Sequence, residues 1–93
     1  MVKKGRKEDF FMDKRVGFVG IIIHDRKNCA EAVNKVLSNF GECIVVRTGV
    51  PNVNNRCSVI TLVVSATTDE LGALTGKLGA IDGISVKSML GKE

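Results

Sequence analysis

Four polar residues of this chain are of types that bind small anions. Asp25, Arg26 and Asn28 follow the first apolar run, and Arg47 lies on the next predicted strand. Guanidinium groups and the free amides at a helix N-terminus bind carboxylates and phosphates. We therefore predict a site for a small anionic ligand at the sheet end where the first strand, the first helix and a later hairpin meet. Arg47 is explained equally well as an edge-strand charge that reaches water and deters aggregation.

A second set of residues, His24, Cys29 and Cys57, could hold a thiophilic metal. Imidazole and two thiolates suit zinc, although a structural zinc site usually has four ligands. Cys43 is expected at the opposite end of the sheet, so it cannot complete the site within one subunit. The odd number of cysteines, without a CxxC pair, argues against a disulfide framework. We expect no metal and no other cofactor, and we keep a metal sensor that uses His24 and the thiols as an alternative function.

The chain shows no catalytic constellation, so we expect no enzyme activity. Residues 72–77, GALTGK, have three residues rather than four between the glycines and a Leu after the Lys, unlike a phosphate-binding loop. His24 and Asp25 are neighbours, and neighbouring side chains on a strand point to opposite faces. A small hydrolase is a second alternative, which turnover of acyl phosphates would support.

Hydrophobic periodicity defines the strands that must position these residues. The predicted strands are 15–23, 42–50, 58–66 and 84–89. The first and third are nearly continuous apolar runs, which is typical of strands covered on both faces. The second and fourth alternate between apolar and polar residues, as edge strands do. This pattern predicts two central strands and two edge strands.

Two amphipathic helices lie between these strands. The first is predicted to begin at Asn28, which has capping-box spacing with Glu31, and to end at Gly41. The second spans 68–81, preceded by Thr67. The apolar faces consist of Val33, Val36, Leu37 and Phe40 on the first helix and Leu71, Leu74, Leu78 and Ile81 on the second. Each helix therefore has one face to bury against a sheet.

The element order β-α-β-β-α-β predicts an α+β fold, the ferredoxin-like sandwich. In this fold a four-stranded antiparallel sheet carries both helices on one face, and we assign residues 15–90 to it. On the second strand, Arg47 shares one face with Cys43, Val45 and Gly49, and we assign this set to the face away from the helices.

One apolar face of such a sheet has no helix to cover it, which predicts a homodimer or tetramer. The pattern does not say which residues face outward, so Phe18 and Val19 are both candidate interface residues. Gly72, Gly76 and Gly79 share one side of the second helix, opposite its leucines. Because each glycine costs a helix up to about 1 kcal/mol relative to alanine, we predict that this stripe also approaches another backbone or a ligand. A frayed helix that packing tolerates is the alternative.

The chain has 93 residues and a formal net charge of +4, and residues 1–15 carry most of this basic excess. Residues 1–14 are predicted to form a flexible basic leader. No basic face with stacking aromatics follows, so we expect no direct binding to nucleic acid. No apolar run approaches the ~20 residues of a membrane span, and no secretory core follows the N-terminus. We therefore expect a cytoplasmic protein without a membrane partner.

Four segments together resemble a known family. They are RVGFVGIIIHDR (15–26), GECIVVRTGVP (41–51), ALTGKLG (73–79) and GISVK (83–87). These segments look like the iron-only hydrogenase system regulators, small proteins that are similar to ACT domains and to the C-terminal domain of nickel-responsive repressors. The resemblance covers about residues 12–90. It implies a ferredoxin-like homo-oligomer with a regulatory or sensory role in the cytoplasm.

The chain departs from these relatives at two places. Nickel-responsive repressors bind metal through several His residues and a Cys, whereas this chain has one His. Their ribbon-helix-helix domain precedes this fold, and residues 1–14 are too few to form one. A typical ACT ligand loop carries a glycine, which residues 24–28 lack. The resemblance therefore transfers neither nickel binding nor amino-acid binding.

Overall fold

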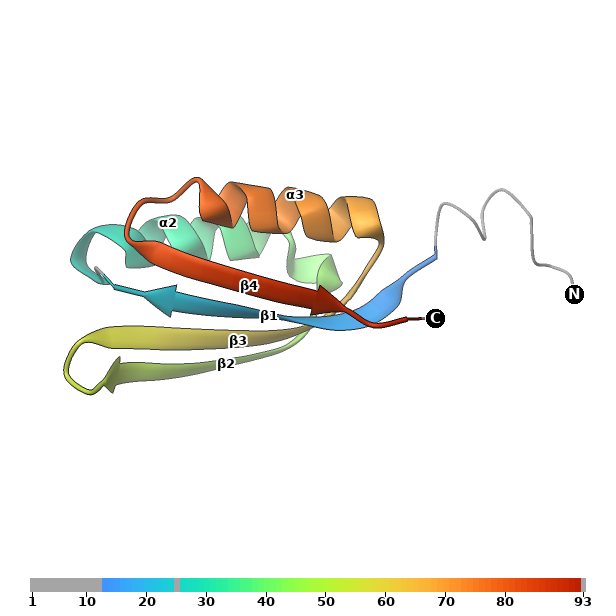
Figure 1. Ribbon diagram of the computed structural model, residues 1–93. Helices are drawn as coiled ribbons and strands as arrows, with labels where there is room; N and C mark the ends of the chain where they lie inside the picture. Colours follow the sequence, from blue (N-terminus) through green and yellow to red (C-terminus); the bar gives the residue numbers. More distant parts are fainter. Residues whose placement is uncertain (1–12, 25, 93) are drawn as a thin grey trace, which may run out of the picture.

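The computed structural model describes residues 13–24 and 26–92, so residues 1–12 of the predicted leader lie outside it (Figure 1). Its elements are β1 (Arg15–Ile23), α2 (Arg26–Asn39), the short 3-10 helix η1 (Gly41–Cys43), β2 (Ile44–Val53), β3 (Cys57–Ala66), α3 (Thr68–Gly79) and β4 (Ile84–Leu90). This order confirms the predicted βαββαβ unit. No helix of the described ranges is long and apolar enough to cross a membrane.

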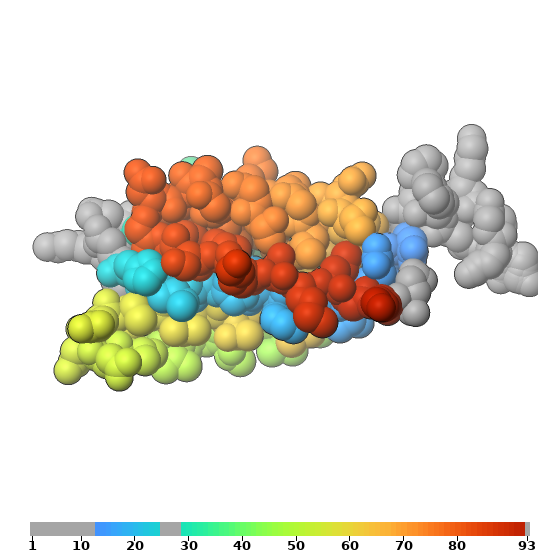
Figure 2. Space-filling view, viewed as in Figure 1, coloured from blue at the N-terminus to red at the C-terminus, as the bar shows by residue number. Residues whose placement is uncertain are grey.

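The four strands form one sheet in the order β2-β3-β1-β4, and all neighbouring pairs are antiparallel. The two strands with continuous apolar runs, β1 and β3, take the central places, as their sequence predicted. Both helices lie on one face of the sheet (Figure 1). Figure 2 shows the same arrangement in space-filling form. In this view β4 and β1 lie in the middle, α3 lies above them, and the β2–β3 hairpin lies below them.

The core lies between the helices and the inner face of the sheet. Its fully buried members are Val19, Ile21, Leu62, Val64, Val33, Leu74 and Leu78. The apolar faces predicted for both helices are therefore confirmed, with Val36, Phe40 and Ile81 packed at the margin of the core. Burying a side chain of this size contributes about 1.5–3 kcal/mol to stability. This packing fixes which residues of each strand face the helices.

The parity of β1, which its sequence left open, is now assigned. Val19 is 0% exposed and packs under the helices, so the prediction that it is an interface residue is wrong. Phe18 points to the other face and is 47% exposed. Its cross-strand neighbours Val63 and Met89 share that face, because paired residues of adjacent strands project to the same side.

A bulge in β2 reverses the predicted faces of this strand. Ile44 pairs with Val64 and Val46 pairs with Val63, so Val45 is an extra residue between two consecutive partners. Such a bulge turns the following residues to the opposite face. Arg47 therefore lies on the helix side of the sheet, and its assignment to the outer face is corrected.

Several predicted boundaries also shift, and α3 ends at Gly79 rather than at residue 81. α2 begins at Arg26, so Asn28 lies in its first turn and is not its cap. β2 continues through Pro51 to Val53, and the turn begins only at Asn54, where φ is 56°. Asparagine tolerates this left-handed conformation better than most residues. The hairpin is therefore longer than its sequence predicted.

The start of α3 is as predicted. The Thr67 hydroxyl accepts a hydrogen bond from the Glu70 amide at 3.1 Å, and Glu70 Oε1 accepts one from the Thr67 amide at 2.8 Å. This capping box satisfies two backbone donors that the helix itself cannot use. It fixes the point at which the chain leaves β3 and starts to cover the sheet.

Candidate functional site

A hollow of about 210 Å³ opens between α2 and the β2–β3 hairpin. Its lining includes Ile23, Ala30, Asn34, Arg47, Pro51 and Ile60. Gly49 also lines it, and a Cβ at this position would meet nothing within 4 Å. The missing side chain of Gly49 therefore leaves room on the helix side of an edge strand.

Arg47 supplies the positive charge of this hollow. Its Nη2 donates a hydrogen bond to Oδ1 of Asn34 on α2. The guanidinium has further donors, so this bond leaves several N–H groups for another acceptor. Apolar walls with one guanidinium at the rim suit a small molecule that carries a carboxylate or phosphate.

The four predicted ligand residues have different outcomes. Arg47 lines the hollow at the predicted end of the sheet. Arg26 and Asn28 lie in the first turn of α2, and Asp25 falls outside the described residues. Sequence reasoning missed Asn34 and Gly49, because only the bulge in β2 turns this strand segment toward α2. Binding at this hollow stays a prediction.

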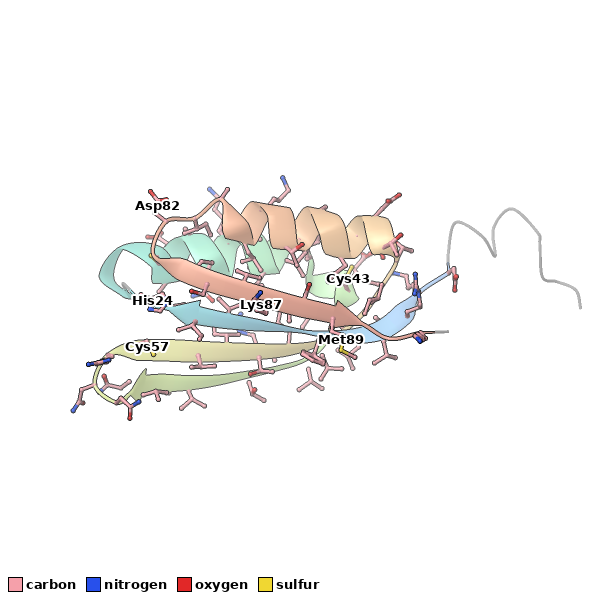
Figure 3. All side chains as sticks on the ribbon, in the orientation of Figure 1. His24, Cys43, Cys57, Asp82, Lys87 and Met89 are labelled. Carbon is pink, nitrogen blue, oxygen red and sulfur yellow. The ribbon has the colours of Figure 1, made fainter. Side chains whose placement is uncertain are left out.

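Two of the three candidate metal ligands, His24 and Cys29, make separate contacts. His24 Nε2 lies 2.9 Å from Ser85 Oγ, and Cys29 Sγ donates to the Asp82 carbonyl at 2.9 Å. Figure 3 shows His24, just after β1, and Cys57, at the start of β3, at one end of the sheet and Cys43 toward the other. Across residues 13–24 and 26–92, no three His, Cys, Asp or Glu side chains are grouped to hold a metal ion. The metal-sensor alternative gains no geometric support.

Cys43 lies at the other end of the molecule, close enough to Glu70 for the charge of this residue to act on the thiol. Burial raises the pKa of the Cys43 thiol, and the charge of Glu70 adds to this effect. A thiol with a raised pKa has less of the nucleophilic thiolate at neutral pH. Cys43 therefore has the character of a structural thiol.

The face of the sheet away from the helices, called here the outer face, presents an apolar surface. Its exposed large side chains include Val16, Phe18, Ile22, Val46, Val63 and Met89. Met89 and Lys87 lie along β4 on the outer edge of this surface (Figure 3). A contiguous apolar face of this kind is typical of an interaction surface.

The glycine stripe of α3 faces outward on the opposite side of the molecule. Gly72, Gly76 and Gly79 are exposed, and a Cβ on any of them would meet nothing within 4 Å. Packing within the subunit therefore does not require these glycines. Their role at an interface stays a prediction.

Together, the topology and the helix arrangement define a ferredoxin-like, ACT-like domain. Of the solved structures, one at 23% identity is the ACT domain from GTP pyrophosphokinase of Chlorobium tepidum, with a TM-score of 0.64 over 82% of this chain and 99% of that one. An ACT domain protein from Streptococcus pneumoniae, at 12% identity, has a TM-score of 0.58 over 82% and 89% of the two chains. These similarities show the fold.

A sequence model of one family matches residues 15–88, and its description reads "TM1266-like: Iron-only hydrogenase system regulator, putative". The chain belongs to this TM1266-like family. It is similar to the uncharacterized protein TM1266 from Thermotoga maritima, with 40% identity and a TM-score of 0.80 over 85% of this chain and 99% of that one. No curated protein sequence matches this chain significantly.

Proposed function

We propose that this protein is a non-catalytic regulatory module that assembles into a homo-oligomer and senses a small anionic ligand. The family description names the process, regulation of an iron-only hydrogenase system. We expect the module to act in the cytoplasm. The observation that carries the proposal is the hollow beside Arg47, because its described lining combines apolar walls with the positive charge of this arginine.

Two features support a ligand rather than a substrate. Within the described chain, the Arg47 side chain donates a hydrogen bond to Asn34 alone, so its guanidinium can also bind an anion. Among the described lining residues, the polar ones besides Arg47 are Asn34 and Ser58, and neither is suited to acid–base work. The polar groups that line the hollow therefore favour binding of a ligand without turnover.

A thermal-shift screen of carboxylates and phosphates tests this proposal. The screen compares the wild type with Arg47→Ala and with Arg56→Ala, a control that removes an exposed arginine from the hairpin turn. We expect some anions to stabilise the wild type and Arg56→Ala, and to bind Arg47→Ala about ten-fold or more weakly, since a hydrogen bond to a charged group contributes about 1.5–3 kcal/mol. The unliganded melting temperature of Arg47→Ala should change little, because this arginine is exposed.

A second variant probes the volume of the hollow. Gly49→Val places a side chain in the hollow without removing Arg47, and a Cβ there has no close neighbour. We expect it to abolish anion stabilisation while the fold is kept. Anions that stabilise both Arg47→Ala and Gly49→Val as well as they stabilise the wild type would exclude this site.

A further inference from the structure

The outer face has the composition of a buried interface. Its outward strand positions carry one charged residue, Lys87, and that residue lies on the edge strand β4, where its ammonium can reach water. The remaining outward positions are aliphatic, aromatic, small or hydroxylic. A partner that covers this face must itself be apolar and nearly uncharged, and a second copy of the same face meets that requirement.

The size of the face is sufficient for a stable pair. Four strands at ~4.8 Å spacing and nine residues at ~3.4 Å rise cover roughly 600 Å² of plan area per copy. Two copies therefore bury on the order of 1,200 Å², which is the lower end of specific interfaces, about 1,200–2,000 Å².

The surface shape of the outer face, with one protruding ring and one gap, shows how two copies can fit together. Phe18 and Gly20 are two residues apart on β1 and share the outer face. Phe18 protrudes, with 47% of its surface exposed, whereas Gly20 leaves a gap between the neighbouring strands. A Cβ on Gly20 would meet only the Lys87 carbonyl oxygen, at 4.0 Å. Because glycine weakens a strand, and no described residue of the subunit requires it here, the gap points to a neighbour outside the described fold.

We propose that two copies pack outer face to outer face, with Phe18 of each copy seated over Gly20 of the other. A two-fold axis that runs between the sheets, perpendicular to β1 and level with Val19, produces this pairing. It satisfies the rule that a two-fold interface is self-complementary, since residue 18 meets residue 20 and residue 20 meets residue 18. The same axis sets Lys87 opposite Met89 of the second copy, so the two ammonium groups do not face each other. This inference rests on the homo-oligomer part of the proposed function.

Sedimentation of the full-length chain across the micromolar range tests the pairing. It compares the wild type with variants in which Phe18 and Gly20 are replaced singly or exchanged. Phe18→Gly leaves a gap opposite Gly20, and Gly20→Phe sets two phenyl rings against each other. Each single variant should raise the dimer dissociation constant about ten-fold or more, as loss of a central aromatic contact does. The double variant Phe18→Gly/Gly20→Phe restores a ring opposite a glycine, and its dissociation constant should return toward the wild-type value. Circular dichroism verifies the fold of each variant.

A charge on the other side of the molecule is the matched control. Lys35→Asp puts a carboxylate at an exposed position of α2, which carries no predicted interface residue, and it should leave a dimer intact, whereas Phe18→Asp should give a monomer. Gly76→Asp tests the glycine stripe of α3 separately, without a clash in the subunit.

The outcomes separate this inference from the proposed function. A wild type that stays monomeric overturns both the homo-oligomer and the face-to-face pair. A wild-type dimer that survives Phe18→Asp, or that the double exchange fails to restore, overturns the pairing alone. A dimer that Gly76→Asp dissolves assigns the interface to α3 instead. If deletion of residues 1–12 turns a monomer into a dimer, the leader covers the outer face and the pairing in the full chain is wrong.

Discussion

Nζ of Lys14 lies 3.1 Å from Oε1 of Glu70 and joins the residue before β1 to the first turn of α3. The hydrogen bond from the Thr67 amide and then the bond from Lys14 hold the pKa of Glu70 below its ordinary value of 4.5. The described end of the predicted leader is therefore tied to a helix cap. Because the pair is exposed, its contribution to stability comes mainly through the cap geometry.

The lowered pKa of Glu70 predicts an acid-dependent loss of stability. A carboxyl whose pKa is lower in the folded state stabilises the fold above its ordinary pKa, and this contribution is lost as the pH falls through the folded pKa. Glu70→Gln should therefore be less stable than the wild type at neutral pH, and the gap should close as the pH falls below 4.5. Urea unfolding at a series of pH values measures this gap.

Asp69→Asn is the control for this series, since it removes a carboxylate from the same turn and leaves the capping box intact. Its stability difference from the wild type should vary less with pH. A gap for Glu70→Gln that is constant between neutral and acid pH would contradict the role given to Glu70. Thr67→Ala should cost about 1 kcal/mol at neutral pH, as loss of an N-cap does.

The fold could be predicted from sequence because its signals are local and agree with each other. The apolar runs of β1 and β3 identify central strands, and the spacing of Thr67 and Glu70 marks the start of α3. The site could not be predicted in the same way, because the bulge at Val45 has no local signature. Alternation alone assigns Arg47 to the wrong face, and only the pairing of Ile44 and Val46 with β3 corrects it.

A close approach of two strands requires Gly17. A Cβ at this position would collide with the Met89 carbonyl oxygen and lie 2.9 Å from Leu90 Cδ1. Gly17→Ala should therefore lower the free energy of unfolding by about 1–3 kcal/mol, because β4 must shift away from β1. Thermal or urea unfolding measures the loss. Gly49→Ala is the matched strand control, since its Cβ meets nothing within 4 Å, and it should not destabilise the protein. Equal losses in both variants would contradict this explanation.

The glycine stripe of α3 predicts a concentration-dependent effect of alanine. In an isolated subunit, Gly76→Ala should raise the free energy of unfolding by about 1 kcal/mol, because alanine favours the helix and its Cβ meets no neighbour. At concentrations where the protein assembles, this gain should shrink if the stripe approaches another backbone. Thermal unfolding at low and high protein concentration compares the two regimes. An equal gain in both would show that the stripe faces water and would remove its predicted interface role.

The three thiols are expected to differ in reactivity. Cys29 is 2% exposed and donates to the Asp82 carbonyl, and Cys43 is 6% exposed with a raised thiol pKa. Cys57 is only half-buried, at the start of β3. Iodoacetamide at neutral pH should therefore alkylate Cys57 first and modify Cys29 and Cys43 only after unfolding, because the thiolate must be both formed and accessible. Peptide mass spectrometry after timed labelling gives the three rates, and Cys57→Ser should show almost no labelling of the folded protein.

The same experiment with added zinc tests the alternative function. His24 and Cys29 make separate contacts, and no three possible ligands are grouped among the described residues, so zinc should not slow the alkylation of Cys57. Protection of Cys57 by equimolar zinc, lost in His24→Ala, would support a metal sensor, since a coordinated thiolate no longer attacks the reagent. Ser85→Ala is the control, because it removes the partner of the His24 imidazole and leaves all three candidate ligands in place. Alkylation of Cys43 as fast as that of Cys57 would contradict the assignment of Cys43 as a buried structural thiol.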